Sequence, residues 1–553
     1  MKIILKLIFL SAILPFLVNC TLLDTKLDLL LTQEDIDSNY KTLSGLGHSA
    51  YLQLENGFET LDNNIRAAMS DEAAQTYLNS SVQEFCRGSW NAYYNPDNVY
   101  EHHYNGIRKI NYFLNYSNDF RNQLAHNRDT LTDSGYQYRL DVADIGWLRA
   151  ESRVLLAYNY FELMKRYGGV PIITKVVFPT DGKVAPTPRS SIDEVVNFSI
   201  NQIDYALDSL QIDWKSFDQQ RDGRFTKGAA MALKARILLY AASPLYNEDN
   251  NIEKWKKAAQ AAHEVIQLKQ YSLSDNYESL FVGEKSVLDK EIIMSLRLGP
   301  TNYFERQNYP VGTPGGNSGV TPSHNLVSAY EYKGHPDSNN PYVNRDPRLN
   351  FSIVTNNSSW NGRTIEIWPG GKDDYRFPNT SRTGYYLKKF LNENLYLQED
   401  ERAVRSWVIF RFGEVLLNYA EAMNEAYGPT NNNGYSYTAL EAINMIRNRK
   451  GVEMPNVTAS NKEEMRKIIK HERRIELAFE GHRYWDLRRW KDAEVVLNQP
   501  LMGVRVQKDN LTFIYTEFVV ENRRFDSPKM YFYPIPQSEV NKTENIVKQN
   551  PGW

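Results

Sequence analysis

Apolar residues recur at three- and four-residue spacing over much of the chain, and this period predicts amphipathic helices. The clearest case is 150–167, AESRVLLAYNYFELMKRY, in which Val154 and Phe161 fall on one face. The run GGVP follows and predicts the end of the helix. Ser191 and Glu194 form a capping-box pattern, so we expect a partner helix to begin there.

The same arrangement of two neighbouring helices returns twice. Segment 227–246 is followed by an apolar period ending at Ile266, and segment 412–427 is followed by 437–447. Small residues lie one turn from large ones, which lets paired helices approach closely, as in tetratricopeptide units. The connecting loops are too unequal for a regular array. The sequence therefore predicts a mainly α fold of irregular tetratricopeptide-like helix pairs that form a scaffold, with unrelated helix hairpins as the alternative on periodicity alone.

A loop-rich, strand-poor insertion is expected at 275–398. Its stretches 299–319 and 356–379 are dense in Gly, Pro and Asn, which break any regular period. These stretches also contain large aromatic residues, namely Tyr303, Phe304, Tyr309, Trp360, Trp368 and Tyr375. Long loops within a compact protein usually carry function, and aromatic residues argue against disorder.

The first twenty residues, MKIILKLIFLSAILPFLVNC, have the form of an export signal. Their apolar run at 7–18 is too short to span a bilayer, which takes about twenty residues in a helix. The sequence LVNC that ends at Cys20 fits a lipoprotein box, in which the cysteine is acylated and becomes the mature N-terminus. We therefore expect a signal peptide at 1–19, a lipidated tether at 20–31, and attachment to a membrane through Cys20.

Charge and cysteine content limit the partners and the chemistry. The chain has 64 Lys+Arg against 67 Asp+Glu, so it lacks the positive field that a nucleic-acid partner needs. If Cys20 is acylated, Cys86 is left without an internal partner, so no disulfide and no cysteine metal site are expected. Cys86 is expected to be a small buried hydrophobe.

The stretch 471–490, HERRIELAFEGHRYWDLRRW, could suggest a metal site, but its spacing argues against one. A zincin helix needs a second histidine one turn after the first, and Ile475 follows His471 there. His482 comes after the expected end of the helix. In 465–479 apolar residues fall on one face while Arg and Glu alternate in sign and can pair across turns. This pattern favours a piece of scaffold.

Other chemical signatures are missing from the sequence. It contains no P-loop lysine motif and no G-x-S-x-G elbow. We therefore predict no catalytic residue, no metal and no cofactor, although the paired carboxylates of a glycosidase leave no mark in sequence. The aromatic loops suit sugars, because flat rings lie against the C–H face of a sugar while polar side chains take its hydroxyls.

Nine stretches, in order along the chain, carry a family resemblance: MSDEAA (69–74), WNAYYNPDNVYEHHYNGIRKINYFL (90–114), LRAESRVLLAYNYFELMKRYGGVPI (148–172), RFTKGAAMALKARILLYAASPLYN (224–247), NRDPRL (344–349), FRFGEVLLNYAEAMNEA (410–426), INMIRNRKGV (443–452), IIKHERRIELAFEGHRYWDLRRW (468–490) and YFYPIPQSEVNKTENIVKQNPGW (531–553). With these motifs the sequence resembles the SusD/RagB family of outer-membrane lipoproteins of Bacteroidetes.

The resemblance implies a fold and a role. It implies four irregular tetratricopeptide-like helix pairs, in an N-terminal helical region at 32–270 and a C-terminal region at 271–553. The latter would comprise the loop-rich 275–398, a helical part at 405–491 and a tail at 492–553. It also implies a lid at the cell exterior on a SusC-like TonB-dependent outer-membrane transporter, which captures oligosaccharides without cleaving them.

Ligand contacts in this family come from loops that vary with the ligand. On that basis we expect binding residues in two areas: Trp90, Tyr93, Tyr94 and Asn95 in the first, and Tyr303, Phe304, Trp360 and Trp368 in the second, with Trp360 preferred. Capture of peptides or glycoprotein fragments by the same lid is the alternative, and a surface glycoside hydrolase is a less favoured one.

Overall fold

The computed structural model describes residues 39–126, 128–176, 185–218 and 221–553. The predicted signal peptide, the tether and Cys20 lie outside the described residues. The longer helices are α3 (Tyr40–His48), α5 (Tyr100–Tyr116), α7 (Tyr136–Tyr167), α8 (Ile192–Ala206), α10 (Lys227–Ala242), α11 (Ile252–Gln267), α15 (Phe412–Tyr427), α16 (Ala439–Arg447), α17 (Lys462–Glu476) and α18 (His482–Arg489). Shorter ones are α4 (Ser81–Arg87), α6 (Phe120–Ala125), α9 (Trp214–Phe217), α12 (Tyr303–Asn308), α13 (His324–Val327), α14 (Arg348–Ser352), α19 (Ala493–Val496) and α20 (Gln537–Lys542).

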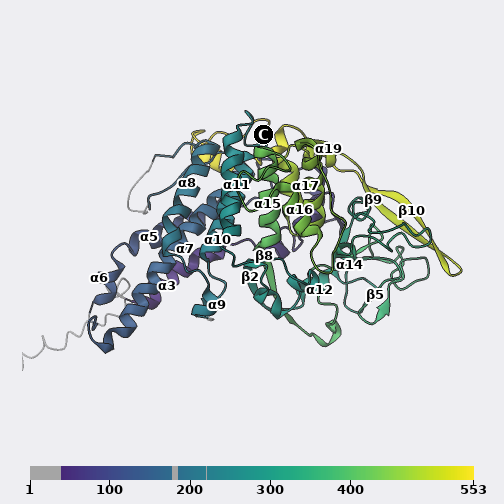
Figure 1. Ribbon diagram of the computed structural model, residues 1–553, viewed down its shortest axis with the longest axis horizontal. Coiled ribbons are helices and arrows are strands. Elements are labelled where there is room, and N and C mark those ends of the chain that lie inside the picture. The colour runs from purple at the N-terminus through teal and green to yellow at the C-terminus, as the bar shows by residue number, and fades with distance from the viewer. Residues whose placement is uncertain (1–38, 127, 177–184, 219–220) are drawn as a thin grey trace, which may run out of the picture.

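The helices form the scaffold of neighbouring pairs that the periodicity predicts (Figure 1). Helix α7 packs against α8, α10 against α11, and α15 against α16. Helix α11 also packs against α15, which joins one pair to the next. The small residues Ala258, Ala259, Ala261 and Ala262 of α11 are all buried, so its neighbours approach closely. The fold class is confirmed.

Local signals set the helix ends. The Ser191 side chain accepts from the Glu194 N–H while the Glu194 carboxylate accepts from the Ser191 N–H, so the predicted capping box is present. Helix α7 ends at Tyr167, followed by Gly168 with φ 74°. Helix α7 begins at Tyr136, which is earlier in the chain than the apolar period predicted. The extra turns bury Ile145 and Leu148 in a small separate cluster with residues of α3, α5 and α6.

Strands are few and form two-stranded antiparallel sheets. The strands are β1 (Ala73–Gln75) with β3 (Val320–Pro322), β2 (Ile292–Thr301) with β8 (Ala403–Arg411), β4 (Ile353–Val354) with β7 (Tyr386–Leu387), β5 (Ser359–Trp360) with β6 (Arg363–Thr364), and β9 (Leu501–Asp509) with β10 (Thr512–Glu521). The sequence did not predict the hairpin β9–β10, which extends from the loop-rich side of the molecule (Figure 1). The expected strand-poor, loop-rich region is present, whereas the domain boundaries stay predictions.

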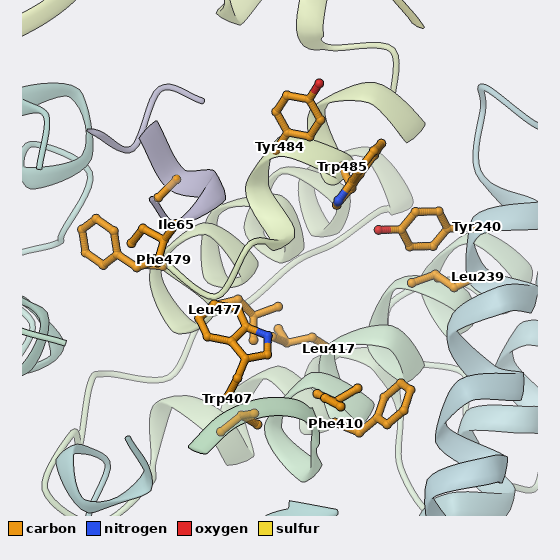
Figure 2. Close-up of a cluster of buried hydrophobic side chains, with 14 of the residues drawn as sticks. Ile65, Leu239, Tyr240, Trp407, Phe410, Leu417, Leu477, Phe479, Tyr484 and Trp485 are labelled. Atoms are coloured by element: carbon orange, nitrogen blue, oxygen red, sulfur yellow. The ribbon is translucent and has the colours of Figure 1, made fainter. Parts of the chain in front are cut away.

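A hydrophobic core joins the loop-rich region to the scaffold (Figure 2). Phe410 of β8 lies near Leu417 of α15, and Trp407 of β8 lies near Leu477 in the turn between α17 and α18, which also carries Phe479. Phe479 is fully buried although its φ is +67°, a conformation that costs about 1–3 kcal/mol outside glycine. Burial of its ring offsets that cost and fixes the turn.

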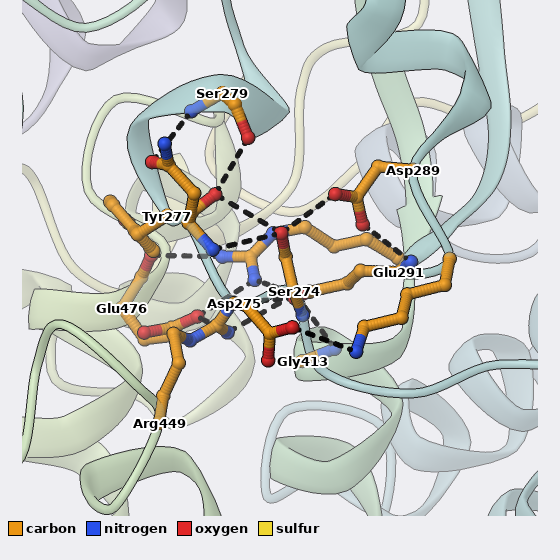
Figure 3. A network of polar contacts seen from close by, with 12 residues as sticks. Ser274, Asp275, Tyr277, Ser279, Asp289, Glu291, Gly413, Arg449 and Glu476 are labelled. Atoms are coloured by element: carbon orange, nitrogen blue, oxygen red, sulfur yellow. Dashed lines mark hydrogen bonds and ion pairs between the residues drawn. The ribbon is translucent and has the colours of Figure 1, made fainter.

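A cluster of buried ion pairs lies beside this core. Arg411, at the end of β8, pairs with Glu291, Glu476 and Glu480, each at 2.8 Å. The full set, which we call the central ion cluster, comprises Glu291, Asp346, Arg348, Lys389, Arg411, Arg449, Glu472, Glu476 and Glu480. Figure 3 shows part of it, where Ser274 donates its N–H to Glu291 at 2.8 Å and the Tyr277 hydroxyl donates to the Glu476 carbonyl at 2.6 Å.

The stretch 471–490 is scaffold, as predicted, but its charges act differently from the prediction. Glu472, Arg473 and Glu476 are buried rather than solvated. They pair with other elements instead of across turns: Arg473 contacts Asp486 at 3.1 Å and Glu476 contacts Arg449 at 2.6 Å. Burial lowers the pKa of His482 to about 4, so this histidine is neutral near pH 7.

Replacing Arg411 tests the central ion cluster. Arg411→Met leaves buried carboxylates without their partner, so we expect the free energy of unfolding to fall by about 3–5 kcal/mol. Arg402→Met is the matched control, since its partner Asp400 lies on an exposed surface, and it should cost about 0–1 kcal/mol. Denaturant titration measures both, and equal losses for the two variants would contradict the buried role.

Acid should weaken the fold through Glu414 and Glu476. Burial alone would raise the pKa of Glu476, but Arg449 and Arg411 outweigh it and hold the pKa at about 2, and Arg236 does the same for Glu414. The folded pKa values lie below the usual 4.5, so the stabilisation is complete above pH 4.5 and is lost as the pH falls toward about 2. Denaturant titrations between pH 7 and 3 should show this loss, and a free energy of unfolding that stays constant down to pH 3 would refute it.

Candidate functional site

The antiparallel pairing of β1 with β3 brings two distant loops together. Gln75 lies opposite Val320, and beyond this pair the Thr76 N–H donates to the Gly319 carbonyl at 2.8 Å. The next residue, Tyr77, is half-buried, and its hydroxyl donates to the Asn317 carbonyl at 3.2 Å. The segment after β1 is thereby fixed along the edge of the loop that follows α12.

Helix α12 presents Tyr303 beside Tyr77. Adjacent residues of a helix point about 100° apart, and here Tyr303 is 40 % exposed while Phe304 is buried against Phe58, with ring centroids 4.8 Å apart. Partial burial raises the pKa of Tyr77, and the neighbouring Tyr303 phenol raises it further. Asn317 connects the two sides, since its carbonyl accepts from the Tyr77 hydroxyl and its side chain donates to the Arg306 carbonyl of α12.

Tyr93 and Tyr94 lie near the other end of the segment that begins at Tyr77. They are 85 % and 51 % exposed, and both backbone N–H groups donate to the Asn91 side chain. A hydrogen bond from Tyr94 to Glu84 raises the pKa of Tyr94, and Tyr94 also bonds Ser81. Since Ser81 follows Tyr77 by four residues, the segment between them connects the two groups of rings.

We call the resulting set the Tyr77 surface: Tyr77, Leu78, Tyr93, Tyr94 and Tyr303. Leu78 is 61 % exposed at its centre. Polar atoms accompany the rings: the Asp62 carboxylate accepts from the Ser80 hydroxyl at 3.0 Å, and Asn317 donates to the Arg306 carbonyl at 3.0 Å. The arrangement offers flat faces next to hydrogen-bonding groups, which is the chemistry that a sugar ring requires.

Four of the predicted contact residues lie elsewhere, in the core. Trp360 is fully buried, edge-on to Tyr309 at 5.1 Å, because strands β5 and β6 turn it inward. Trp368 is buried under Phe513 at 5.0 Å. Trp90 is buried and stacks on Phe85 at 4.7 Å. Together with Phe304, these side chains offer no free face to a ligand, which corrects the expectation that they are binding platforms.

Asn95 has a local role, since its side chain accepts from the Asp97 N–H at 3.0 Å. The sequence reasoning missed Tyr77 and Leu78, which follow the MSDEAA motif after two intervening residues. The signal available in the sequence was the pair Tyr77 and Leu78 placed directly before Asn-Ser-Ser, residue types that favour a turn.

Cys86 is buried, as predicted, with its Sγ 3.5 Å from the Ala68 carbonyl. In the part of the chain that the structure describes, no group of three or more His, Cys, Asp or Glu side chains is arranged to hold a metal ion. Within the same residues, no helix has the length and apolar character needed to span a membrane.

Two family matches divide the chain between them. The SusD family matches residues 290–553. A SusD-like family described as starch-binding and associating with the outer membrane matches residues 22–239. The chain belongs to the SusD family. This confirms the resemblance that the motifs indicated, and the family is one described as associated with the outer membrane.

Relatives and solved structures agree with this assignment. SusD-like protein P38 of Formosa agariphila is 27 % identical over 64 % of this chain and 68 % of its own length. A SusD-like protein from Bacteroides fragilis has the same fold, with a TM-score of 0.77 and 25 % identity over 94 % of this chain and 98 % of that one. A SusD-like carbohydrate-binding protein from the same organism aligns with a TM-score of 0.73 at 24 % identity, covering 92 % of this chain and 99 % of that one.

Trp360 should affect stability. Trp360→Ala removes a fully buried ring, so we expect a loss of about 3–5 kcal/mol in the free energy of unfolding. Tyr93→Ala, at an exposed position of the Tyr77 surface, should change it by less than about 0.5 kcal/mol. Thermal or denaturant unfolding compares the two, and a Trp360→Ala protein as stable as the unsubstituted chain would show that the ring is not part of the core.

Proposed function

We propose that this SusD-family protein binds oligosaccharides at the outer membrane and does not cleave them, and that the Tyr77 surface is its binding site. The observation that carries the proposal is that the exposed tyrosines Tyr94 and Tyr303 lie near the two ends of the segment that begins at Tyr77, while the rings of Trp90, Phe304, Trp360 and Trp368 are buried. The descriptions of the matched family as starch-binding and of a similar structure as carbohydrate-binding support it.

The number of stacked rings sets the binding affinity that we expect. Each stacked tyrosine contributes about 0.5–1.5 kcal/mol beyond the area that it buries. Three such contacts on an open surface give weak binding, in a range of about micromolar to millimolar dissociation constants. Tyrosines lose little conformational entropy on binding, because each has two rotatable side-chain bonds.

The finer part of the proposal concerns delivery. We propose that acylation of Cys20 tethers the protein at the outer membrane, facing the exterior. From there it would hand its ligand to a SusC-like TonB-dependent transporter. Weak binding suits this role, since a ligand held too tightly would not be released to the transporter.

Substitutions in the Tyr77 surface test the site. Tyr303→Ala and Tyr77→Ala should each weaken binding of a neutral oligosaccharide about three- to tenfold, and the double variant should reduce it further. Tyr205→Ala is the matched control, because Tyr205 is an exposed tyrosine of α8 outside the Tyr77 surface. Isothermal titration against a polysaccharide panel measures the affinities.

The outcomes separate the alternatives. Glycan binding that survives both tyrosine substitutions would move the site away from the Tyr77 surface. Displacement of the glycan by oligopeptides, with tighter peptide binding, would favour peptide capture. New reducing ends during incubation would show cleavage and overturn the non-catalytic assignment.

A further inference from the structure

A cavity of about 370 Å³ lies where α17, α18 and α19 meet the start of β9. None of its lining residues belongs to the Tyr77 surface. One wall is basic, with Arg474, Arg483 and Arg523 around Asp71. The other is apolar and includes Val495 and Leu497. We call it the Arg474 cavity.

The carboxylates that pair with the arginines of the basic wall are each shared by two guanidinium groups. Asp71 accepts from Arg474 at 2.7 Å and from Arg483 at 2.8 Å. Glu521 is likewise shared by Arg523 at 2.8 Å and Arg382 at 2.7 Å. The ion pairs of this wall therefore contain more positive than negative charge.

The neighbouring carboxyl, Glu72, does not restore the balance. Burial, and then the charge of Asp71, raise the pKa of Glu72 to about 8, so the group is mostly protonated near neutral pH. Burial, and the charge of Arg483 beside it, lower the pKa of Arg474 even though Asp71 is its partner. A guanidinium in that environment gains from a further anion nearby.

Hydrogen-bond donors of the wall also lack partners. The Nε of Arg474 is buried and makes no hydrogen bond to the described residues. The Nη2 of Arg474 is used twice, by Asp71 and by the Asn325 carbonyl at 3.1 Å. Within the residues that the structure describes, no hydrogen bond reaches the Nη1 of Arg474 or of Arg483. Two forked cations with unused donors beside one cavity form an arrangement that recognises oxyanions.

We propose that the Arg474 cavity binds a small oxyanion group, which the Nη1 groups of Arg474 and Arg483 hold. The group would be a sulfate, a phosphate or a carboxylate. It enters either as a free ion or as the anionic end of a larger ligand whose apolar part lies against Val495 and Leu497. This site is independent of the glycan proposal.

Titration with sodium sulfate, at an ionic strength held constant with sodium chloride, tests the site. The full mature protein should give saturable heats, and Tyr303→Ala should leave them unchanged. Val495 lies at the cavity and is 63 % exposed, so its substitution spares the fold. Val495→Glu places a negative charge there and should weaken sulfate binding at least about tenfold, whereas the neutral Val495→Gln should stay within about twofold.

Acetate and hexanoate distinguish the two sources of the anion. Tighter binding of hexanoate than of acetate would assign the apolar wall to the tail of a larger ligand. If sulfate binds and neither acetate nor hexanoate does, the cavity is a site for a free inorganic ion. The proposal is overturned if none of the three anions gives saturable heats, or if Val495→Glu binds as tightly as Val495→Gln. Circular dichroism of each variant checks that it is folded.

Discussion

The central ion cluster is the interaction on which the rest of the structure depends. Removing charges from water costs several kcal/mol for each ion, and the attraction between partners offsets this only when geometry is good and each charge has several contacts. Arg411 meets that condition, since it bonds three carboxylates and the Glu476 carbonyl. The cluster joins Arg348, at the start of α14, to Glu472 of α17, and Lys389 to Glu480 in the turn between α17 and α18. It therefore holds the loop-rich region against the helical frame with directional contacts that apolar packing alone does not supply.

A rigid attachment of this kind lets irregular loops keep one conformation. The loop after α12 lies against the segment after β1 through hydrogen bonds from Thr76 and Tyr77. Large rings such as Trp360 and Tyr309 fill the interior of the loop region, whereas Tyr303 stays partly exposed.

The sequence predicted elements that depend on local signals. Helix α15 has the predicted bounds, and the capping box at Ser191 is where the pattern placed it. The first turns of α7, which pack on residues of α3, α5 and α6, were missed, and so was the local hairpin of β9 with β10. Apolar residues alternate in the hairpin, but it lies within 492–553, the segment that was expected to be a tail.

The sequence predicted the two areas that contribute to the candidate site, but not which of their residues are exposed. Both areas named from the family resemblance contribute to the Tyr77 surface, through Tyr93 and Tyr94 in one and Tyr303 in the other. Which ring of an aromatic pair faces outward depends on tertiary packing, as Tyr303 and Phe304 illustrate. In the stretch 471–490 the alternation of charge was visible, but the partners of those charges lie up to about four hundred residues away, as with Asp71 and Arg483. Periodicity carries no information about such partners.

That separation has a consequence for how the protein is made. Asn550 donates to the Tyr167 carbonyl at 3.0 Å, and the Trp553 ring lies on Trp90 at 4.6 Å. A chain that lacks residues 550–553 cannot form these contacts, so Trp90 and the end of α7 stay partly uncovered until that segment arrives, and the N-terminal helices complete their packing late in folding.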